Sequence, residues 1–261
     1  MEVHAHTHTA RKKWTHYFWE FIMLFLAVFC GFLAEYQLEH KIEKDRAKEL
    51  ARSFYDELKG DSANVVIRIQ NRVKQENAFG YLMSYFRDSS LTNVSKTFQL
   101  NFLYGILFRS PSIFEPRTVV LDQLKNSGSL RYFKNEELQK LIGDLSVAIH
   151  NVIDRQALES TVRMTYLNPF IIQHYDYEFE KKLRNDNETD IFSAINKYEH
   201  NDEVIPFQFK SSAKLDREYA VNLMGFYGRN GMESTRTIHL KRYVEVNTAL
   251  LKLLHEVYHL K

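Results

Sequence analysis

The longest uninterrupted apolar stretch of the chain lies near its N-terminal end. No charged residue occurs between Phe21 and Ala34, and nine of these positions are Phe, Ile, Leu or Val. Aromatic residues, which favour the membrane–water interface, flank the stretch at both ends: Trp14, Tyr17, Phe18, Trp19 and Tyr36. Because a membrane-spanning helix needs about twenty residues, the pattern predicts one transmembrane helix over residues 14–36.

The energetics of insertion favour lipid. At roughly −0.3 to −0.6 kcal/mol each, the nine residues contribute about −3 to −5 kcal/mol. Glu20 lies a turn before the apolar core, so it costs less than the roughly +2.5 to +3.5 kcal/mol of a central charge. The alternatives are a buried helix of a soluble protein and a cleaved signal peptide. Cleavage after Ala34 would put Phe32 where a small residue is required, so an uncleaved anchor is favoured.

One face of this helix combines an acid with small residues. Glu20, Ala27, Gly31 and Ala34 fall on a single stripe at 3.6 residues per turn. Small side chains let helices approach closely in lipid, and an acid within a membrane prefers a protein neighbour. We therefore expect this face to pack against another transmembrane helix, from a second copy or from a different membrane protein. The alternative is that Glu20 extends to the headgroups and the small residues are incidental.

Charges around the anchor indicate its orientation. Arg11, Lys12 and Lys13 precede it directly, whereas basic and acidic residues alternate after it. The compact basic cluster favours a cytoplasmic N-terminus and a periplasmic C-terminal domain, in the inner (plasma) membrane.

The remaining chain predicts an all-α fold in which the transmembrane helix continues into an antiparallel helical bundle. No Pro or Gly occurs between Glu35 and Gly60, so we expect the helix to run on as a charged stalk over residues 37–60. Residues 1–13 form a flexible tail. A helical bundle over 61–261 follows the stalk, and we expect Val73 and Ile153 among the buried side chains of this bundle.

Proline, glycine and helix-capping residues set the predicted helix boundaries within the bundle. One helix is expected over 95–109 and the next from about Pro116. A long helix from Asn135 is expected to kink or end at Pro169. Residues 228–231 predict a turn before a last helix that starts near Ser234.

A short segment between two of these helices predicts a sharp corner. Gly128 is expected in the left-handed conformation that closes a helix, with Leu130 as the hydrophobic contact of the cap. Asn135 is expected to cap the next helix. Leu124, Ser127, Gly128, Leu130 and Asn135 thus form a structural corner.

Charge and composition limit the function classes. The net charge is +2 and no stripe of Lys and Arg appears, so nucleic acid is not an expected partner. The single cysteine lies inside the apolar stretch, which leaves no Cys–His nucleophile. We expect no cofactor.

Two histidine patterns are candidate metal sites. His255-Glu256-Val257-Tyr258-His259 has the H-E-x-x-H spacing of zinc hydrolases. It lies in the last helical turn, where no third ligand follows, so packing is the favoured explanation. His4, His6 and His8 alternate in the polar tail, where a flexible segment is favoured over a metal site.

The anchor and the corner together resemble a known group. The anchor ends FCGFLAEYQLEH, and Leu124, Lys125, Ser127, Gly128, Leu130, Arg131 and Asn135 form a Leu-Lys-x-Ser-Gly-x-Leu-Arg segment followed by Asn. In these features the chain resembles a large group of uncharacterised single-pass membrane proteins of the Bacteroidota. The resemblance implies an envelope protein with one anchor and a helical domain, and it supplies no catalytic residue.

The sequence therefore favours a non-enzymatic single-pass inner-membrane protein whose helical domain mediates protein–protein interaction or self-association. Its expected partners are the lipid bilayer and either a second copy or another membrane protein. The alternatives are a ligand-binding, sensor-like module that signals through a membrane partner and, more remotely, a zinc-dependent hydrolase using His255, Glu256 and His259.

Overall fold

The computed structural model describes residues 14–107, 112–184 and 190–260, and the regular structure within these ranges is entirely helical, which confirms the all-α prediction. The α-helices are α1 (Trp14–Asp88), α2 (Lys96–Phe102), α3 (Val119–Asn126), α4 (Glu136–Val162), α5 (Asn168–His174), α6 (Tyr177–Arg184), α7 (Ile191–His200), α8 (Arg217–Gly225) and α9 (Lys241–Tyr258). Wider π-helical turns form η1 (Leu103–Leu107), η4 (Arg163–Leu167), η6 (Phe226–Glu233) and η7 (Thr235–Leu240), and 3₁₀ turns form η3 (Ser129–Tyr132) and η5 (Ser212–Lys214). The predicted tail, with His4, His6 and His8, lies outside the described residues.

The chain divides into two compact units, one up to Ala51 and the other from Arg52 onward. Helix α1 contributes to both units. Phe54 and Leu58, which fall in the predicted stalk, are buried in the second unit.

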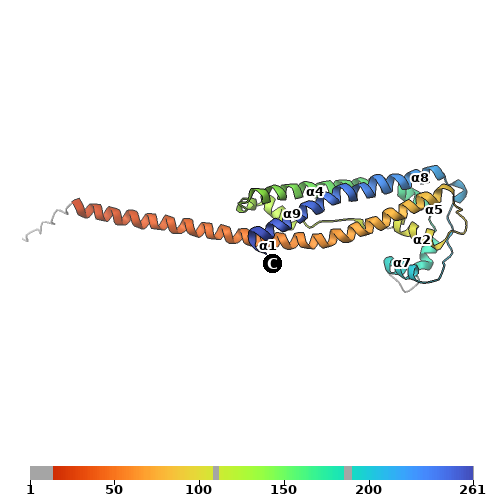
Figure 1. Ribbon diagram of the computed structural model, residues 1–261, viewed down its shortest axis with the longest axis horizontal. Helices are drawn as coiled ribbons and strands as arrows, with labels where there is room; N and C mark the ends of the chain where they lie inside the picture. Colours follow the sequence, from red (N-terminus) through yellow and green to blue (C-terminus); the bar gives the residue numbers. More distant parts are fainter. Residues whose placement is uncertain (1–13, 108–111, 185–189, 261) are drawn as a thin grey trace, which may run out of the picture. The chain divides into compact units, whose positions relative to one another are not determined.

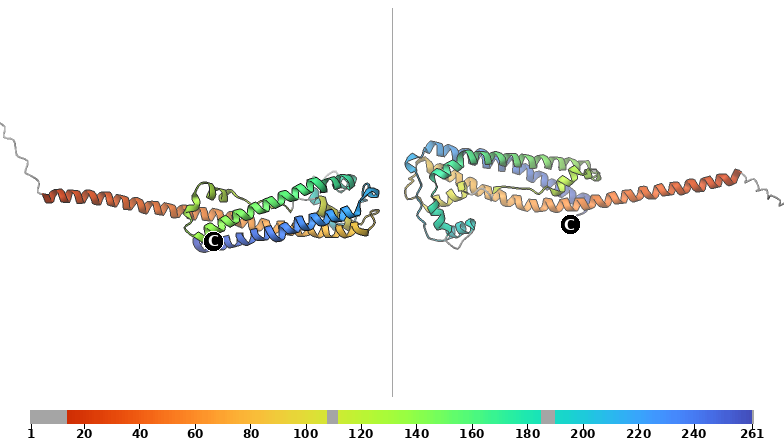
Figure 2. Two further views of the ribbon diagram at one scale, coloured as in Figure 1. Left: turned by 90° about the horizontal axis from the view of Figure 1, so that it is seen from above. Right: turned by 180° about the vertical axis from the view of Figure 1, so that it is seen from behind.

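Three long helical stretches form the body of the second unit (Figures 1 and 2). They are α1 from residue 52, helix α4, and the run from α8 through η6 and η7 to α9, which packs on α4. The last run is antiparallel to α1, because Arg217 donates to the Phe86 carbonyl whereas Asn247 donates to the Leu58 carbonyl.

Helices α1 and α4 run in the same direction, which requires the chain to cross back between them. Residues 112–118, here called the return segment, make this crossing. Its first residue, Ser112, lies beside Arg72, and the N–H of Arg117 donates to Asp61 further toward the start of the unit. The bundle therefore contains both parallel and antiparallel helix pairs.

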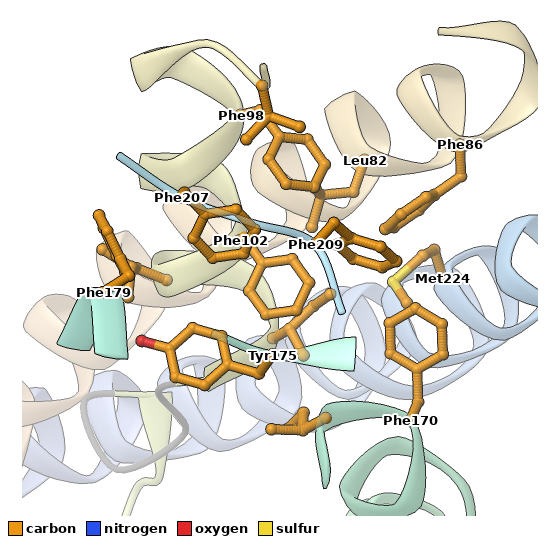
Figure 3. Close-up of a cluster of buried hydrophobic side chains, with 14 of the residues drawn as sticks. Leu82, Phe86, Phe98, Phe102, Phe170, Tyr175, Phe179, Phe207, Phe209 and Met224 are labelled. Atoms are coloured by element: carbon orange, nitrogen blue, oxygen red, sulfur yellow. The ribbon is translucent and has the colours of Figure 1, made fainter. Parts of the chain in front are cut away.

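An aromatic cluster fills the end of the bundle where α1 finishes (Figure 3). Phe102 stacks on Tyr175 with ring centroids 5.6 Å apart, and Phe207 meets Phe179 edge-on at 5.2 Å. The cluster is drawn from α1, α2, α5, α6, α8 and the irregular segment before η5; its labelled members are Leu82, Phe86, Phe98, Phe102, Phe170, Tyr175, Phe179, Phe207, Phe209 and Met224.

Of the two boundaries set by prolines, the helix start at Pro116 was wrong. Helix α3 begins at Val119, after Thr118 as N-cap, so Pro116 belongs to the return segment and does not start the helix. At Pro169 the helix type changes: the π-helical turn η4 lies directly before it, and α5 begins at Asn168 with Pro169 among its first residues. The π-helical turn shifts the hydrogen-bond pattern that proline would interrupt, so the backbone stays helical as far as His174.

The turn predicted over residues 228–231 was also wrong. These residues form part of η6, and helical backbone runs unbroken from Arg217 to Tyr258. Val73 and Ile153, expected to be buried, are 38% and 49% exposed, since Arg72 and Val152 take the inward positions beside them.

Candidate functional site

The N-terminal part of α1 is an apolar helix with nothing packed on it within the first unit. It is long and apolar enough to cross a membrane: its best 18-residue window has a mean hydropathy of 2.0, and none of that window is buried. Phe21, Leu24 and Phe32 are each at least 65% exposed. Rings four residues apart cover one side, with Phe25 stacked between Phe21 and Phe29 at 6.3 and 5.9 Å.

In the structure His16 joins the predicted stripe of Glu20, Ala27, Gly31 and Ala34. The Nε2 of His16 lies 3.1 Å from the Oε1 of Glu20, one turn away on the same face as Ala27, Gly31 and Ala34. A proton on His16 would compensate the Glu20 charge. Ala27, Gly31 and Ala34 are exposed, and a Cβ added to Gly31 would meet no atom within 4 Å. Within the described chain, packing therefore does not require a glycine at this position.

The second unit contains a buried ion pair at its centre. Arg72 on α1 donates from both terminal nitrogens to Glu159 on α4, at 2.9 and 3.1 Å, and the two side chains are 0% and 2% exposed. The Nε of Arg72 donates to the carbonyl of Ser112 at 3.0 Å. The pair thus joins two helices and the return segment.

Two glutamines extend this polar cluster along the return segment. Gln156 makes two hydrogen bonds to Phe114: it accepts from the backbone N–H at 2.8 Å and donates to the carbonyl at 2.9 Å. Gln75 accepts from the Ser112 hydroxyl at 2.7 Å and donates to the Gly105 carbonyl at 2.8 Å. These buried side chains supply the hydrogen bonds that an extended segment inside a helical bundle cannot make to itself.

Two acids of α1 hold the other end of the return segment. Asp61 accepts from the N–H of Arg117 at 2.9 Å and from the Tyr243 hydroxyl at 3.2 Å. Glu57 accepts from the N–H groups of Val120 and Leu121 at 3.0 and 3.4 Å. It thereby takes the place of an N-cap for α3, because the side chain of the N-cap residue Thr118 accepts no backbone N–H of the helix and its hydroxyl instead donates to Asp122 at 2.8 Å.

Burial raises the pKa values of Asp61 and Tyr243. Desolvation raises the pKa of Asp61 above its usual 3.8, and the nearby Glu57 adds to the rise, while hydrogen bonds from Arg117 and Tyr243 oppose it. Burial also raises the pKa of Tyr243, and Asp61 reinforces that shift. Because the oxygens of Glu57 and Asp61 accept backbone N–H groups, these carboxylates are explained as structural ligands of the return segment and the α3 terminus.

Two of the corner residues, Gly128 and Asn135, have the predicted local geometry. Gly128 has φ +70°, and the side chain of Asn135 accepts from the N–H of Leu138 at the start of α4. Leu124 is buried and Leu130 is partly exposed. The Ser127 hydroxyl lies 2.6 Å from that of Ser129. These contacts lie within the corner itself and describe a tight helix–helix connection.

The H-E-x-x-H segment does not have the helical geometry that its spacing requires. Helix α9 ends at Tyr258, and His259 follows in a left-handed conformation with φ +50°. His255, Glu256 and His259 are all exposed. Within the part of the chain that the structure describes, no group of three or more His, Cys, Asp or Glu side chains is placed to hold a metal ion.

The aromatic residues near His174 mostly belong to the core. Tyr175 and Phe179 are buried in the aromatic cluster, whereas Tyr177 is 55% exposed. His174 stacks on Phe209 with centroids 5.1 Å apart, and its Nδ1 is 2.9 Å from the Lys210 carbonyl. These residues therefore fix the irregular segment before η5 against α5.

The chain matches no protein-family model, no curated protein and no solved structure. The features of the molecule that bear on its function are therefore the exposed apolar helix and the interior of the second unit.

Proposed function

We propose that the protein is a single-pass membrane protein whose α-helical extramembrane unit binds another protein, either a second copy or a different membrane protein. It acts by binding and not by catalysis. The observation that carries the proposal is that no residue in the most apolar window of α1 is buried. Water is a poor solvent for such a surface, and lipid is the environment that this composition favours.

The stripe of His16, Glu20, Ala27, Gly31 and Ala34 supports association within the membrane. Small residues on one helix face are typical of close helix–helix packing in lipid. Among the residues that the structure describes, nothing lies within 4 Å of a Cβ added to Gly31, and the glutamate–histidine pair offers a polar group that a neighbouring helix can bind. We propose this face as the transmembrane contact surface.

The resemblance to single-pass proteins of the Bacteroidota supports the proposed location. We place the protein in the inner membrane, with the N-terminus in the cytoplasm and the second unit in the periplasm. The basic residues Arg11, Lys12 and Lys13 directly before the apolar segment support this orientation.

Fractionation tests the membrane assignment. After cell lysis, ultracentrifugation and an alkaline carbonate wash, we expect the intact chain in the pellet and its release only by detergent. A chain that stays in the supernatant would contradict the proposal.

Maleimide labelling tests the orientation. A membrane-impermeant maleimide should label a Cys30→Ser, Asn77→Cys variant in cells with a permeabilised outer membrane, because Asn77 is exposed. Labelling only after lysis would reverse the orientation.

Disulfide crosslinking tests the contact face. In a Cys30→Ser background, Ala27→Cys and Gly31→Cys should give a higher crosslinking yield than Phe25→Cys and Phe29→Cys, which lie on the other side of the helix. The size of the adduct distinguishes a second copy from a different partner. Equal yields at all four positions would exclude this face as the contact surface.

A further inference from the structure

A small apolar cavity, partly open to solvent, lies between α4 and the π-helical segment η6, and Leu158 and Phe226 in its wall are about half exposed. Its volume is about 130 Å³. Leu158 and Val162 line it from α4, and Phe226 and Tyr227 line it from η6, so most of the wall is hydrocarbon. For comparison, an apolar protein cavity of about 150 Å³ holds one benzene molecule. The cavity is thus close in size to a site that holds one aromatic ring.

A glycine keeps this cavity open. Gly231 lines the cavity, and a Cβ added to it would lie 3.7 Å from the Cγ of Glu159, an ordinary contact distance. By contrast, a Cβ at Gly228 would lie only 2.9 Å from the Cβ of Phe79. Helix packing therefore requires glycine at 228 and does not require it at 231. A glycine inside a helix destabilises it relative to alanine, and here it leaves space in the wall of the cavity.

The polar groups at the cavity favour an uncharged occupant with one acceptor oxygen. Glu159 and Arg155 both line the cavity, and the Glu159 charge is already compensated by Arg72. An anion would meet the Glu159 carboxylate and a cation would meet the Arg155 guanidinium. Arg155 donates from Nη2 to the Asn230 carbonyl at 2.7 Å, while its Nε is buried without a hydrogen-bond partner.

From these observations we infer that the cavity is a binding site for a small phenol, an uncharged ring compound with one hydroxyl group. The ring occupies the space beside Leu158, Val162 and Phe226, and the hydroxyl oxygen accepts from the Nε of Arg155. Half of the lining is supplied by a π-helical segment, a rare conformation that occurs frequently at functional sites. This inference is independent of the membrane assignment, because every lining residue belongs to the second unit.

Fluorine NMR of the full-length protein in lipid nanodiscs tests the inference, with 4-fluorophenol as the probe. We expect the ¹⁹F signal of the probe to be broader with the protein than with empty nanodiscs. Gly231→Leu should remove this additional broadening, because the new side chain fills the cavity. The matched control is Gly143→Leu, at an exposed position of α4 where an added Cβ meets nothing within 4 Å, and it should retain the broadening.

Several outcomes would overturn the inference. Wild-type protein that broadens the signal no more than empty nanodiscs shows that no phenol binds, and equal broadening by the Gly231→Leu variant places the binding elsewhere. Circular dichroism establishes whether that variant is folded. If it is not, Gly231→Ala decides, since its Cβ fits at 3.7 Å and should still reduce the broadening. Equal broadening of 4-fluorobenzoate or 4-fluorotoluene would contradict an uncharged, hydroxyl-bearing ligand.

Discussion

Arg72 and Glu159 form a two-pronged ion pair, at 2.9 and 3.1 Å, in the centre of the helical unit. Each occupies a position that its helix otherwise gives to a buried apolar side chain. On α1 one series of buried positions recurs every seven residues at Leu58, Val65, Arg72, Phe79 and Phe86. On α4 a series with the same spacing falls at Leu138, Leu145, Val152 and Glu159. The charged pair therefore replaces one apolar layer of the helix interface.

Breaking this pair should be strongly destabilising. In Glu159→Leu the Arg72 guanidinium stays buried without its anion, so we expect the free energy of unfolding to fall by about 3–5 kcal/mol. Adding Arg72→Leu should recover much of this loss, because the second change removes the uncompensated charge. Urea unfolding followed by circular dichroism at 222 nm measures both values.

The exposed pair between Asp144 and Arg242, 3.5 Å apart, provides the control. Asp144→Ala should change stability by no more than about 1 kcal/mol. If Glu159→Leu were as mild as Asp144→Ala, the buried pair would not be formed in solution.

The return segment should depend on the amide of Gln156. Gln156→Leu leaves the N–H and the carbonyl of Phe114 buried without partners, and each such group costs about 1–3 kcal/mol. We therefore expect a loss of at least about 2 kcal/mol in the free energy of unfolding. Gln123→Leu, at an exposed position of α3, should be close to neutral. Similar losses in the two variants would show that the Phe114 hydrogen bonds are not the cause.

Local patterns predicted the features that depend on neighbouring residues. The apolar stretch, the left-handed Gly128 and the Asn135 cap each depend on residues within a few positions in the sequence. The structure has all three features. The seven-residue repeat also places Arg72 on the buried face, so the position could have been identified as a charged residue in an apolar series.

The return segment could not be predicted, because its partners are remote in the chain. Ser112 is bound by a residue 40 positions earlier and Phe114 by one 42 positions later. Pro116 suggests a helix start when only its neighbours are considered, whereas in the fold it lies in an extended segment whose hydrogen bonds come from other helices. The glycines of η6 were misassigned to a turn for the same reason, since the need for Gly228 comes from Phe79.

Replacing Gly228 or Gly143 by alanine should change the stability of the protein in opposite directions. Gly228→Ala places a Cβ 2.9 Å from that of Phe79, which forces a shift that typically costs about 1–3 kcal/mol. Gly143→Ala meets no atom and should stabilise the protein by about 0.5–1 kcal/mol, because alanine loses less conformational entropy in a helix. Denaturation midpoints of the two variants, compared with wild type, give the signs. A stabilising Gly228→Ala would show that α1 and η6 are further apart than described.

The buried carboxyl of Asp61 should make stability depend on pH in the direction opposite to most acids. Its pKa is raised by burial in the folded state above the usual 3.8, so the folded protein binds this proton more tightly than the unfolded chain. The resulting stabilisation is complete below pH 3.8, is lost as the pH rises to the raised pKa, and does not change at higher pH.

Asp61→Asn removes this pH-dependent contribution to the free energy of unfolding. Relative to wild type, the variant should therefore become more stable between pH 4 and pH 7, by about 1.4 kcal/mol for each unit of the pKa rise. Urea unfolding at both pH values measures the difference, with exposed Asp56→Asn as the control for loss of one formal charge. The same difference from wild type at both pH values would mean that Asp61 titrates identically in the folded and unfolded states.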